Sequence, residues 1–280
     1  VLDFYSERIG PYSYERMGHV QANGVRGGME SATSIFYGDD SVNDPKSTRW
    51  RNVIIHEMAH HWFGNAITEN DWDHVWLSEG FATYFTHLFI EHAYGRDEFV
   101  AGLRADRDTI REFDQKNPDY RIVHDNLSDM SKVTSGPGTY RKGAWTLHML
   151  RGLIGDDAFW AGTRQYYKEY RDKNASTSDF RRVMEKASGK ELGWFFDQWL
   201  TRGGFLKVRA RWSYDAAAKA VRLEVEQLQP GLPLRMPIEV NLEVAGEVVP
   251  RTAKIEVRER KETLTLPLDR APKSLILDPR

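Results

Sequence analysis

Apolar side chains recur at helical spacing through most of the chain up to residue 200. The clearest case is residues 79–93, where apolar positions follow the i, i+3, i+4, i+7 and i+8 spacing of one helical face. The same spacing predicts a helix over residues 47–63, which Ser47 or Thr48 can cap and Gly64 can end. Further helices are expected at residues 96–112, 140–153, 156–171, 177–188 and 191–200.

Two other segments follow a different pattern. Residues 17–38 are rich in glycine, small and β-branched residues, which predicts short strands of a small mixed sheet. After Gly204 the period changes to two, and apolar residues alternate with charged ones over residues 206–212. Short strands with the same alternation are expected at residues 221–225, 238–244, 254–257, 263–268 and 274–277. The fold class predicted is therefore α+β: a mostly helical domain at 1–203, then an antiparallel β-sandwich at 204–280.

Composition narrows the classes of protein that fit. An apolar content of 40% over 280 residues is enough for a packed core. The net charge of -2 gives no electrostatic case for nucleic acid or an anionic membrane as a partner. The absence of cysteine excludes disulfides and thiolate metal sites. No membrane-spanning run or signal peptide is visible. Because the chain begins at Val1, in a segment typical of a protein interior, we expect a piece of a longer protein and predict no localisation.

The stretch His56-Glu57-Met58-Ala59-His60 has the spacing of a catalytic metal site. Residues four apart lie on the same face of a helix, so His56 and His60 can reach one ion. Glu57 is rotated by roughly 100° from His56, which keeps it near the ion without binding it. That is the place for a general base acting on a zinc-bound water.

A third ligand must supply oxygen or nitrogen, because the chain has no thiolate. Glu79 begins the next predicted helix and is flanked by Trp76, Leu77 and Phe81. An unpaired carboxylate in apolar surroundings is costly, and a metal would satisfy it. The sequence therefore predicts one zinc ion held by His56, His60 and Glu79.

The other histidines are not predicted to bind the metal. His61 lies one residue past a ligand and points elsewhere, so we expect it at the surface or in contact with a ligand side chain. Surface or packing roles are expected for His19, His74, His87, His92, His124 and His148.

The motifs together resemble a known family. "HEMAHHWFGN" followed by "WLSEGF" is similar to the zinc aminopeptidases of the membrane alanyl aminopeptidase family, which are gluzincins and include leukotriene hydrolase. "GGMES", "TYRKGAWTLHML" and "WFFDQWLTRGGF" match further motifs of that family in the right order. The resemblance covers nearly the whole chain. It implies a thermolysin-like catalytic domain with a β-sandwich behind it, one zinc ion, and peptide substrates with a free amino terminus.

The resemblance also assigns the remaining site residues. Glu30 would bind the substrate's α-amine, and Gly27, Gly28 and Met29 would form the strand on which the substrate lies. Tyr140 would hydrogen-bond the oxyanion as it forms. Taken alone, Glu30 would be an exposed acid, the two glycines a turn, and Tyr140 a core or interface residue.

The sequence also departs from the family at some positions, and two alternative functions remain open. Ser31 and Ser78 stand where asparagine is common in the family. Family members usually carry a β-rich domain before the catalytic one, and many carry a helical domain after it, so we expect additional domains in the parent protein. The alternatives are a zinc endopeptidase of the thermolysin type, which would have no use for Glu30 as an amine anchor, and a non-catalytic peptide-binding module.

Overall fold

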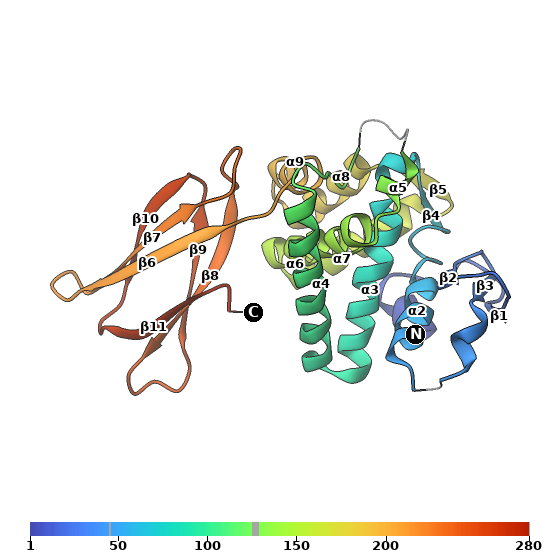
Figure 1. Cartoon of the computed structure of the whole chain (residues 1–280), viewed down its shortest axis with the longest axis horizontal. Helices are drawn as coiled ribbons and strands as arrows, with labels where there is room; N and C mark the ends of the chain where they lie inside the picture. The colour runs from blue at the N-terminus through green and yellow to red at the C-terminus, as the bar shows by residue number, and fades with distance from the viewer. Residues whose placement is uncertain (45, 125–128, 280) are drawn as a thin grey trace. The chain divides into compact units, whose positions relative to one another are not determined.

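The computed structural model describes residues 1–44, 46–124 and 129–279. Contacts within the chain divide it into two compact units, Val1–Gly203 and Gly204–Arg280 (Figure 1). The first unit is mostly helical and the second consists of strands. No helix among the described residues combines the length and apolar character needed to cross a membrane.

Helices build most of the first unit, and each predicted helix has a counterpart. They are α1 (Leu2–Arg8), α2 (Thr48–Ala59), α3 (Trp76–Tyr94), α4 (Arg96–Lys116), α5 (Met130–Val133), α6 (Gly143–Ile154), α7 (Asp156–Tyr170), α8 (Thr177–Ser188) and α9 (Gly193–Leu200). Short 3₁₀ turns lie at η1 (Asp39–Val42) and η2 (Trp72–His74). A π-helical segment, η3 (Gly136–Lys142), leads into α6.

Four predicted helix boundaries differ from the structure by three residues or more: the helix expected at 96–112 continues to Lys116, and the other three are wrong for local reasons. The helix predicted to reach Phe63 ends at Ala59, because the N–H groups of His61 and Trp62 bond three residues back and tighten the turn. The helix predicted from Glu79 begins at Trp76, because η2 already supplies the turn before it and the N–H of Glu79 bonds the Val75 carbonyl. Tyr140 was expected to open an α-helix and instead lies in the π-helical η3.

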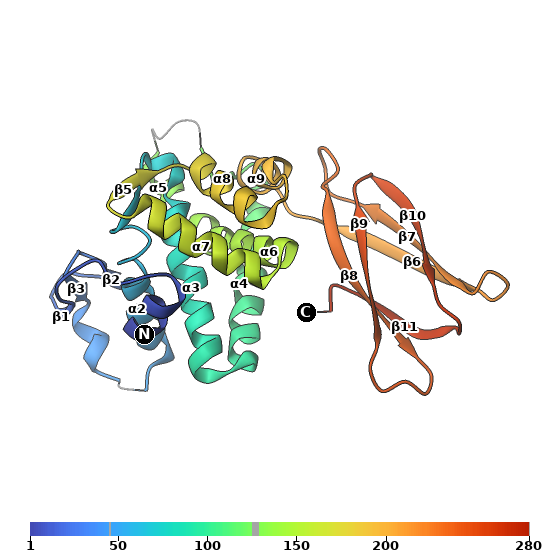
Figure 2. The same ribbon diagram turned by 180° about the vertical axis from the view of Figure 1, so that it is seen from behind.

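Helix α3 forms the centre of the first unit's core. It contacts α2, α4 and α6, and the views in Figure 1 and Figure 2 show α3 and α4 side by side. Its apolar residues are buried on almost every side, and the rings of Phe63 and Phe180 lie 4.6 and 4.9 Å from that of Phe81. A helix buried in this way is a rigid base for the side chains at its first turn.

Two small sheets complete the first unit. Strand β3 (Ser34–Tyr37) lies between β1 (Gly18–Gln21), which is parallel to it, and β2 (Gly28–Met29), which is antiparallel. The predicted mixed sheet is therefore present, and β2 contacts α2. A second sheet pairs β4 (Ile67–Glu69) with β5 (Lys173–Ala175) in parallel.

The second unit contains two antiparallel sheets of three strands each. Their orders are β10-β7-β6 and β11-β8-β9, and the inward side chains of both form one apolar cluster that includes Leu223 and Val240. The bounds are β6 (Val208–Asp215), β7 (Ala220–Gln227), β8 (Met236–Val244), β9 (Arg251–Val257), β10 (Lys261–Pro267) and β11 (Pro272–Leu277). This is the predicted antiparallel β-sandwich.

Candidate active site

Three predicted ligand atoms converge at the C-terminal end of α2 and the first turn of α3. The Nε2 atoms of His56 and His60 are 3.0 Å apart, and each lies 3.2 Å from Oε2 of Glu79. In a tetrahedral zinc site with bonds of about 2.0–2.1 Å, neighbouring ligand atoms are roughly 3.3 Å apart. The triangle of donors therefore fits one ion of this size and chemistry.

The second ring nitrogen of His60 has its own partners. Nδ1 lies 3.0 Å from the Phe63 carbonyl and 3.1 Å from the Ser78 hydroxyl, and the residue is 1% exposed. Because a carbonyl can only accept, Nδ1 carries a proton, which leaves Nε2 as the ring atom that can bind a metal. Ser78, where the family commonly has asparagine, thus orients a predicted ligand, and only its position beside Glu79 in the sequence signals this.

Glu57 lies buried beside the cluster, against β2. A Cβ atom added to Gly28 would stand 2.3 Å from the Glu57 carboxyl carbon, so the missing side chain of Gly28 makes room for this carboxylate. Burial raises the pKa of Glu57 to about 7, the charges of Glu30 and Glu79 act in the same direction, and His60 opposes them. A carboxylate with such a pKa is suited to take and return a proton at neutral pH. A cation at the cluster would lower the pKa by direct attraction.

Tyr140 reaches the same cluster from η3. Its hydroxyl donates a hydrogen bond of 2.7 Å to Oε1 of Glu79, and its ring is stacked 5.9 Å from that of His56. Burial raises the pKa of Tyr140, and the charge of Glu79 raises it further, so the hydroxyl remains a donor at neutral pH.

A close crossing of two backbones brings Tyr140 and Glu79 together. A Cβ atom added to Gly80 would lie 3.0 Å from the Cα and carbonyl carbon of Gly143. Both residues must be small there, because side chains would separate α3 from the start of α6. Glu79 directly precedes Gly80, and Tyr140 lies within one turn of Gly143.

Glu30 and its neighbours lie at the edge of the small sheet. Glu30 follows β2, and its backbone carbonyl accepts a hydrogen bond of 2.6 Å from the Asn65 side chain. Its charge acts on the pKa values of His60, Glu57 and Tyr140, which puts it in the same site. Met29 is 52% exposed on this edge strand, for which β3 is the one strand partner among the described residues. Gly27 lies directly before β2.

Two further residues near the cluster are not evident from the sequence. Tyr37 is buried on β3, its hydroxyl is 2.9 Å from Nδ1 of His19, and both burial and the charge of Glu57 raise its pKa. Burial raises the pKa of Glu69 at the end of β4, and the charges of Glu79 and Glu30 add to this effect. Neither belongs to a recognisable motif, so only the fold brings them to the site.

The remaining histidines take packing roles more often than surface ones. His61 is fully buried, stacked on Tyr12 and 2.9 Å from its hydroxyl, so the surface alternative is wrong for this residue. It points away from the cluster, as predicted, because the aromatic segment around Tyr12 covers it. His87 lies 2.7 Å from Asp106 inside the fold.

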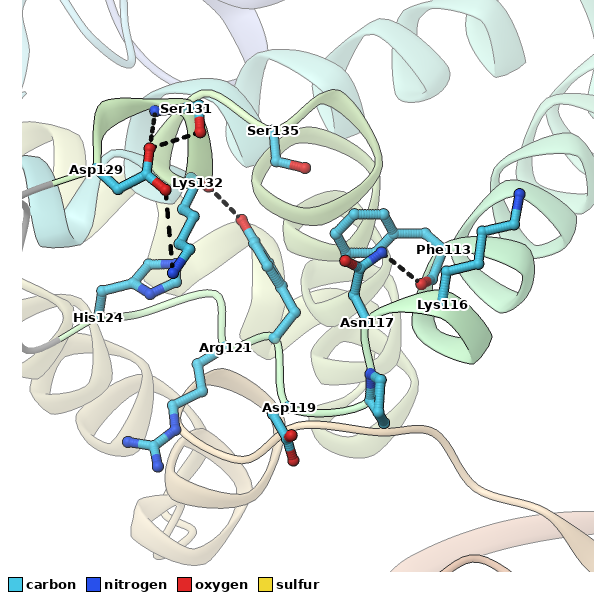
Figure 3. Close-up of a pocket in the computed structure, with 12 residues that line it drawn as sticks. Phe113, Lys116, Asn117, Asp119, Arg121, His124, Asp129, Ser131, Lys132 and Ser135 are labelled. Atoms are coloured by element: carbon cyan, nitrogen blue, oxygen red, sulfur yellow. Dashed lines mark hydrogen bonds and ion pairs between the residues drawn. The ribbon is translucent and has the colours of Figure 1, made fainter.

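A separate pocket of about 780 Å³ lies where α4 ends (Figure 3). Its walls come from the end of α4, the segment after it, and α5 up to Ser135, the residue before η3. None of the predicted site residues is among its described lining residues. The pocket is therefore distinct from the cluster of predicted metal ligands.

Comparison with known proteins relates the site to a family. Residues 1–199 match the peptidase family M1 domain. Glutamyl aminopeptidase of Sus scrofa is 33% identical over 179 residues, covering 62% of this chain and 19% of that protein. Aminopeptidase M1 of Arabidopsis thaliana is 27% identical over 243 residues, covering 81% of this chain and 26% of that protein.

Structural similarity extends over both units. The crystal structure of Legionella pneumophila aminopeptidase A in complex with aspartic acid has a TM-score of 0.80 at 19% identity, covering 99% of this chain and 32% of that chain. At that identity the likeness shows the fold. The chain spans about a fifth to a quarter of the length of these two sequence relatives. Because residues 1–199 match the family's domain, this chain belongs to peptidase family M1.

Proposed function

We propose that this chain is the catalytic part of a zinc aminopeptidase, with Val1–Gly203 as its catalytic domain and Gly204–Arg280 as its β-sandwich domain. One zinc ion would be held by His56, His60 and Glu79. The observation that carries the proposal is the triangle of donor atoms at 3.0–3.2 Å, with the outer nitrogen of His60 already bonded to a carbonyl. When bound, zinc would acidify a water molecule and polarise the scissile carbonyl.

The chain's own residues would handle the protons and the developing charge. Glu57 takes a proton from the attacking water and returns it to the leaving amine. Its burial supports this role, because a carboxylate removed from bulk water holds a proton more readily. The Tyr140 hydroxyl, a donor 2.7 Å from a ligand oxygen, would turn to the oxyanion as it forms.

The edge strand would hold the substrate. Gly27, Gly28 and Met29 would pair with the peptide backbone along the free edge of β2. The Glu30 carboxylate would bind the free α-amine by a charge-assisted hydrogen bond, which fixes the first peptide bond at the cluster. Peptides with a free amino terminus are therefore the expected substrates.

Two observations favour an aminopeptidase over the alternatives. Glu30 adds a negative charge to the cluster, which an endopeptidase would not need as an amine anchor. The relatives of Sus scrofa and Arabidopsis thaliana are both named as aminopeptidases. A non-catalytic module would have no reason to keep Glu57 and Tyr140 beside an intact set of ligands. Because the relatives are much longer, additional domains of the parent protein would complete the cleft.

The test combines metal content with hydrolysis of a panel of aminoacyl anilides and their amino-acetylated forms. The parent chain is compared with Glu57→Gln and Glu30→Gln, and with Glu112→Gln, an exposed position on α4, as the matched control. We expect one zinc in all four proteins, activity on free amines in the parent and the control, none in Glu57→Gln, and a raised KM in Glu30→Gln.

Each of the other possible outcomes would contradict part of the proposal. Protein without zinc would refute the ligand assignment. Cleavage of amino-acetylated peptides would favour the endopeptidase. One bound zinc without turnover of any substrate would favour the peptide-binding module.

A further inference from the structure

A buried ion pair joins α4 to the segment that carries Tyr140. The Lys142 ammonium lies 2.9 and 3.0 Å from the two carboxylate oxygens of Asp114. Asp114 is 1% exposed and Lys142 is 6% exposed, so both charges are removed from water. Lys142 is the last residue of η3, two positions after Tyr140.

Stability alone does not account for such a pair. Removing two charges from water is expensive, and well-packed apolar residues of similar volume are often as stable or more stable. What an ion pair adds is direction, because the ammonium must meet the carboxylate at hydrogen-bond distance. Asp114 therefore fixes where the end of η3 lies along α4.

The neighbours of Tyr140 on both sides are held as well. Arg141 donates to Asp106 of α4 at 3.0 Å, and Asp106 also meets His87 of α3. On the other side, the Thr139 hydroxyl lies 2.9 Å from the Tyr120 hydroxyl, which itself donates to the backbone carbonyl of Lys132 in α5. Phe113, at the end of α4, and Ser135, which precedes η3, line the same pocket (Figure 3).

Such anchoring matters because η3 is π-helical. A π-helical turn is an uncommon backbone geometry that usually needs support from its surroundings. In this segment it directs the Tyr140 hydroxyl to Glu79. The anchors at positions 139, 141 and 142 leave Tyr140 as the residue of this stretch that faces the metal cluster.

We propose that Asp114 is a positioning residue for catalysis: through Lys142 it holds η3 so that the Tyr140 hydroxyl faces the oxyanion site. The inference rests on the proposed function of Tyr140. Asp114 itself touches no ligand of the cluster in the described structure, so its effect on the reaction passes through Tyr140.

The first test measures kcat and KM with the ion pair removed in two ways. Asp114→Asn breaks the pair, whereas the double variant Asp114→Val/Lys142→Met replaces it with apolar side chains and guards against failure to fold. Each change is also made with Tyr140→Phe. We expect a roughly ten- to hundredfold fall in kcat, with KM within about twofold, when Tyr140 is present. In the Tyr140→Phe background we expect no further fall.

The controls separate positioning from general damage. Val183→Ala, a buried position on α8, reproduces a loss of packing away from Tyr140 and should leave kcat unchanged. Lys142→Arg keeps the charge and should retain most of the kcat that the double variant Asp114→Val/Lys142→Met loses. An equal fall in kcat with and without the Tyr140 hydroxyl, or an unchanged kcat in both ion-pair variants, would overturn the proposal.

A second measurement does not depend on turnover. Hydrogen exchange followed by mass spectrometry should show faster exchange at residues 136–142 in both ion-pair variants and unchanged exchange in α2. If the parent chain hydrolyses nothing, the proposed function fails, while this comparison still decides whether the ion pair holds η3. Unchanged exchange at residues 136–142 would show that the pair does not hold η3.

Discussion

The crossing of α3 and α6 gives the sharpest prediction. A Cβ atom at Gly143 would lie 3.1 Å from the Cα of Gly80, whereas carbon atoms in contact prefer about 3.5–4.0 Å. Because the obstacle is backbone, Gly143→Ala must push the two helices apart by roughly 0.4–0.9 Å. Gly152 on the same helix is exposed and has no atom within 4 Å of its added Cβ, so Gly152→Ala is the matched control.

The two substitutions are expected to change the free energy of unfolding in opposite directions. Overpacking costs about 1–3 kcal/mol, and the better helix propensity of alanine offsets about 0.5–1 kcal/mol of it. Gly143→Ala should therefore lower the free energy of unfolding by up to about 2.5 kcal/mol, which for a unit of this size lowers Tm by up to about 10 °C. Gly152→Ala should gain about 0.5–1 kcal/mol, because only the propensity term remains.

The same shift should be visible in catalysis. Separating the helices moves Tyr140 away from Glu79, so we expect kcat of Gly143→Ala to fall roughly tenfold or more, with Gly152→Ala at the parent value. Thermal unfolding and anilide hydrolysis on the three proteins check both parts. A Gly143→Ala variant that melts above the parent would refute the packing argument, and one that is less stable but fully active would refute the link to Tyr140.

Three further outcomes are expected. Removing metal with a chelator should lower Tm, and zinc at about 100 times its Kd should restore about 2.7 kcal/mol of stability. A Tm that changes neither with the chelator nor with added zinc would contradict the metal site. Burial lowers the pKa of His148 to about 4, Arg151, Arg96 and His87 act in the same direction, and Glu91 opposes them. Between about pH 6.5 and pH 4 the unfolded chain therefore binds a proton that the folded one does not, and stability falls as the pH falls. Because His61 and the other titrating groups contribute equally to both proteins, denaturant titrations should show a loss from pH 7 to pH 5 that is about 2 kcal/mol larger in the parent than in His148→Gln, and an equal slope in both proteins would contradict this. The side chain of Ser176 accepts from the N–H of Asp179 in a capping box at α8, so Ser176→Ala should cost about 1 kcal/mol in urea unfolding, whereas Ser188→Ala should stay within about 0.5 kcal/mol.

Local sequence determined the elements and the spacing of the ligands. Apolar periodicity over α3 and α8 was sufficient to predict them, because neighbours along a helix share one face whatever lies opposite. The relation between His56 and His60 is local in the same way. Although α2 ends at Ala59, His60 keeps helical dihedral angles, and the one-turn spacing of the two rings is retained.

Only the tertiary structure decided the environment of each site residue. The pKa of Glu57 depends on burial and on the charges of Glu30, which follows β2, and Glu79 on α3, and no spacing in the sequence encodes either. The π-helical turn at Tyr140 was not predictable as such, since its anchors Asp106 and Asp114 lie on α4, far along the chain. His61 is buried for the same kind of reason, because Tyr12 comes from a distant segment. Periodicity is a property of residues adjacent in sequence, whereas burial, charge and backbone strain depend on which distant residues folding brings into contact.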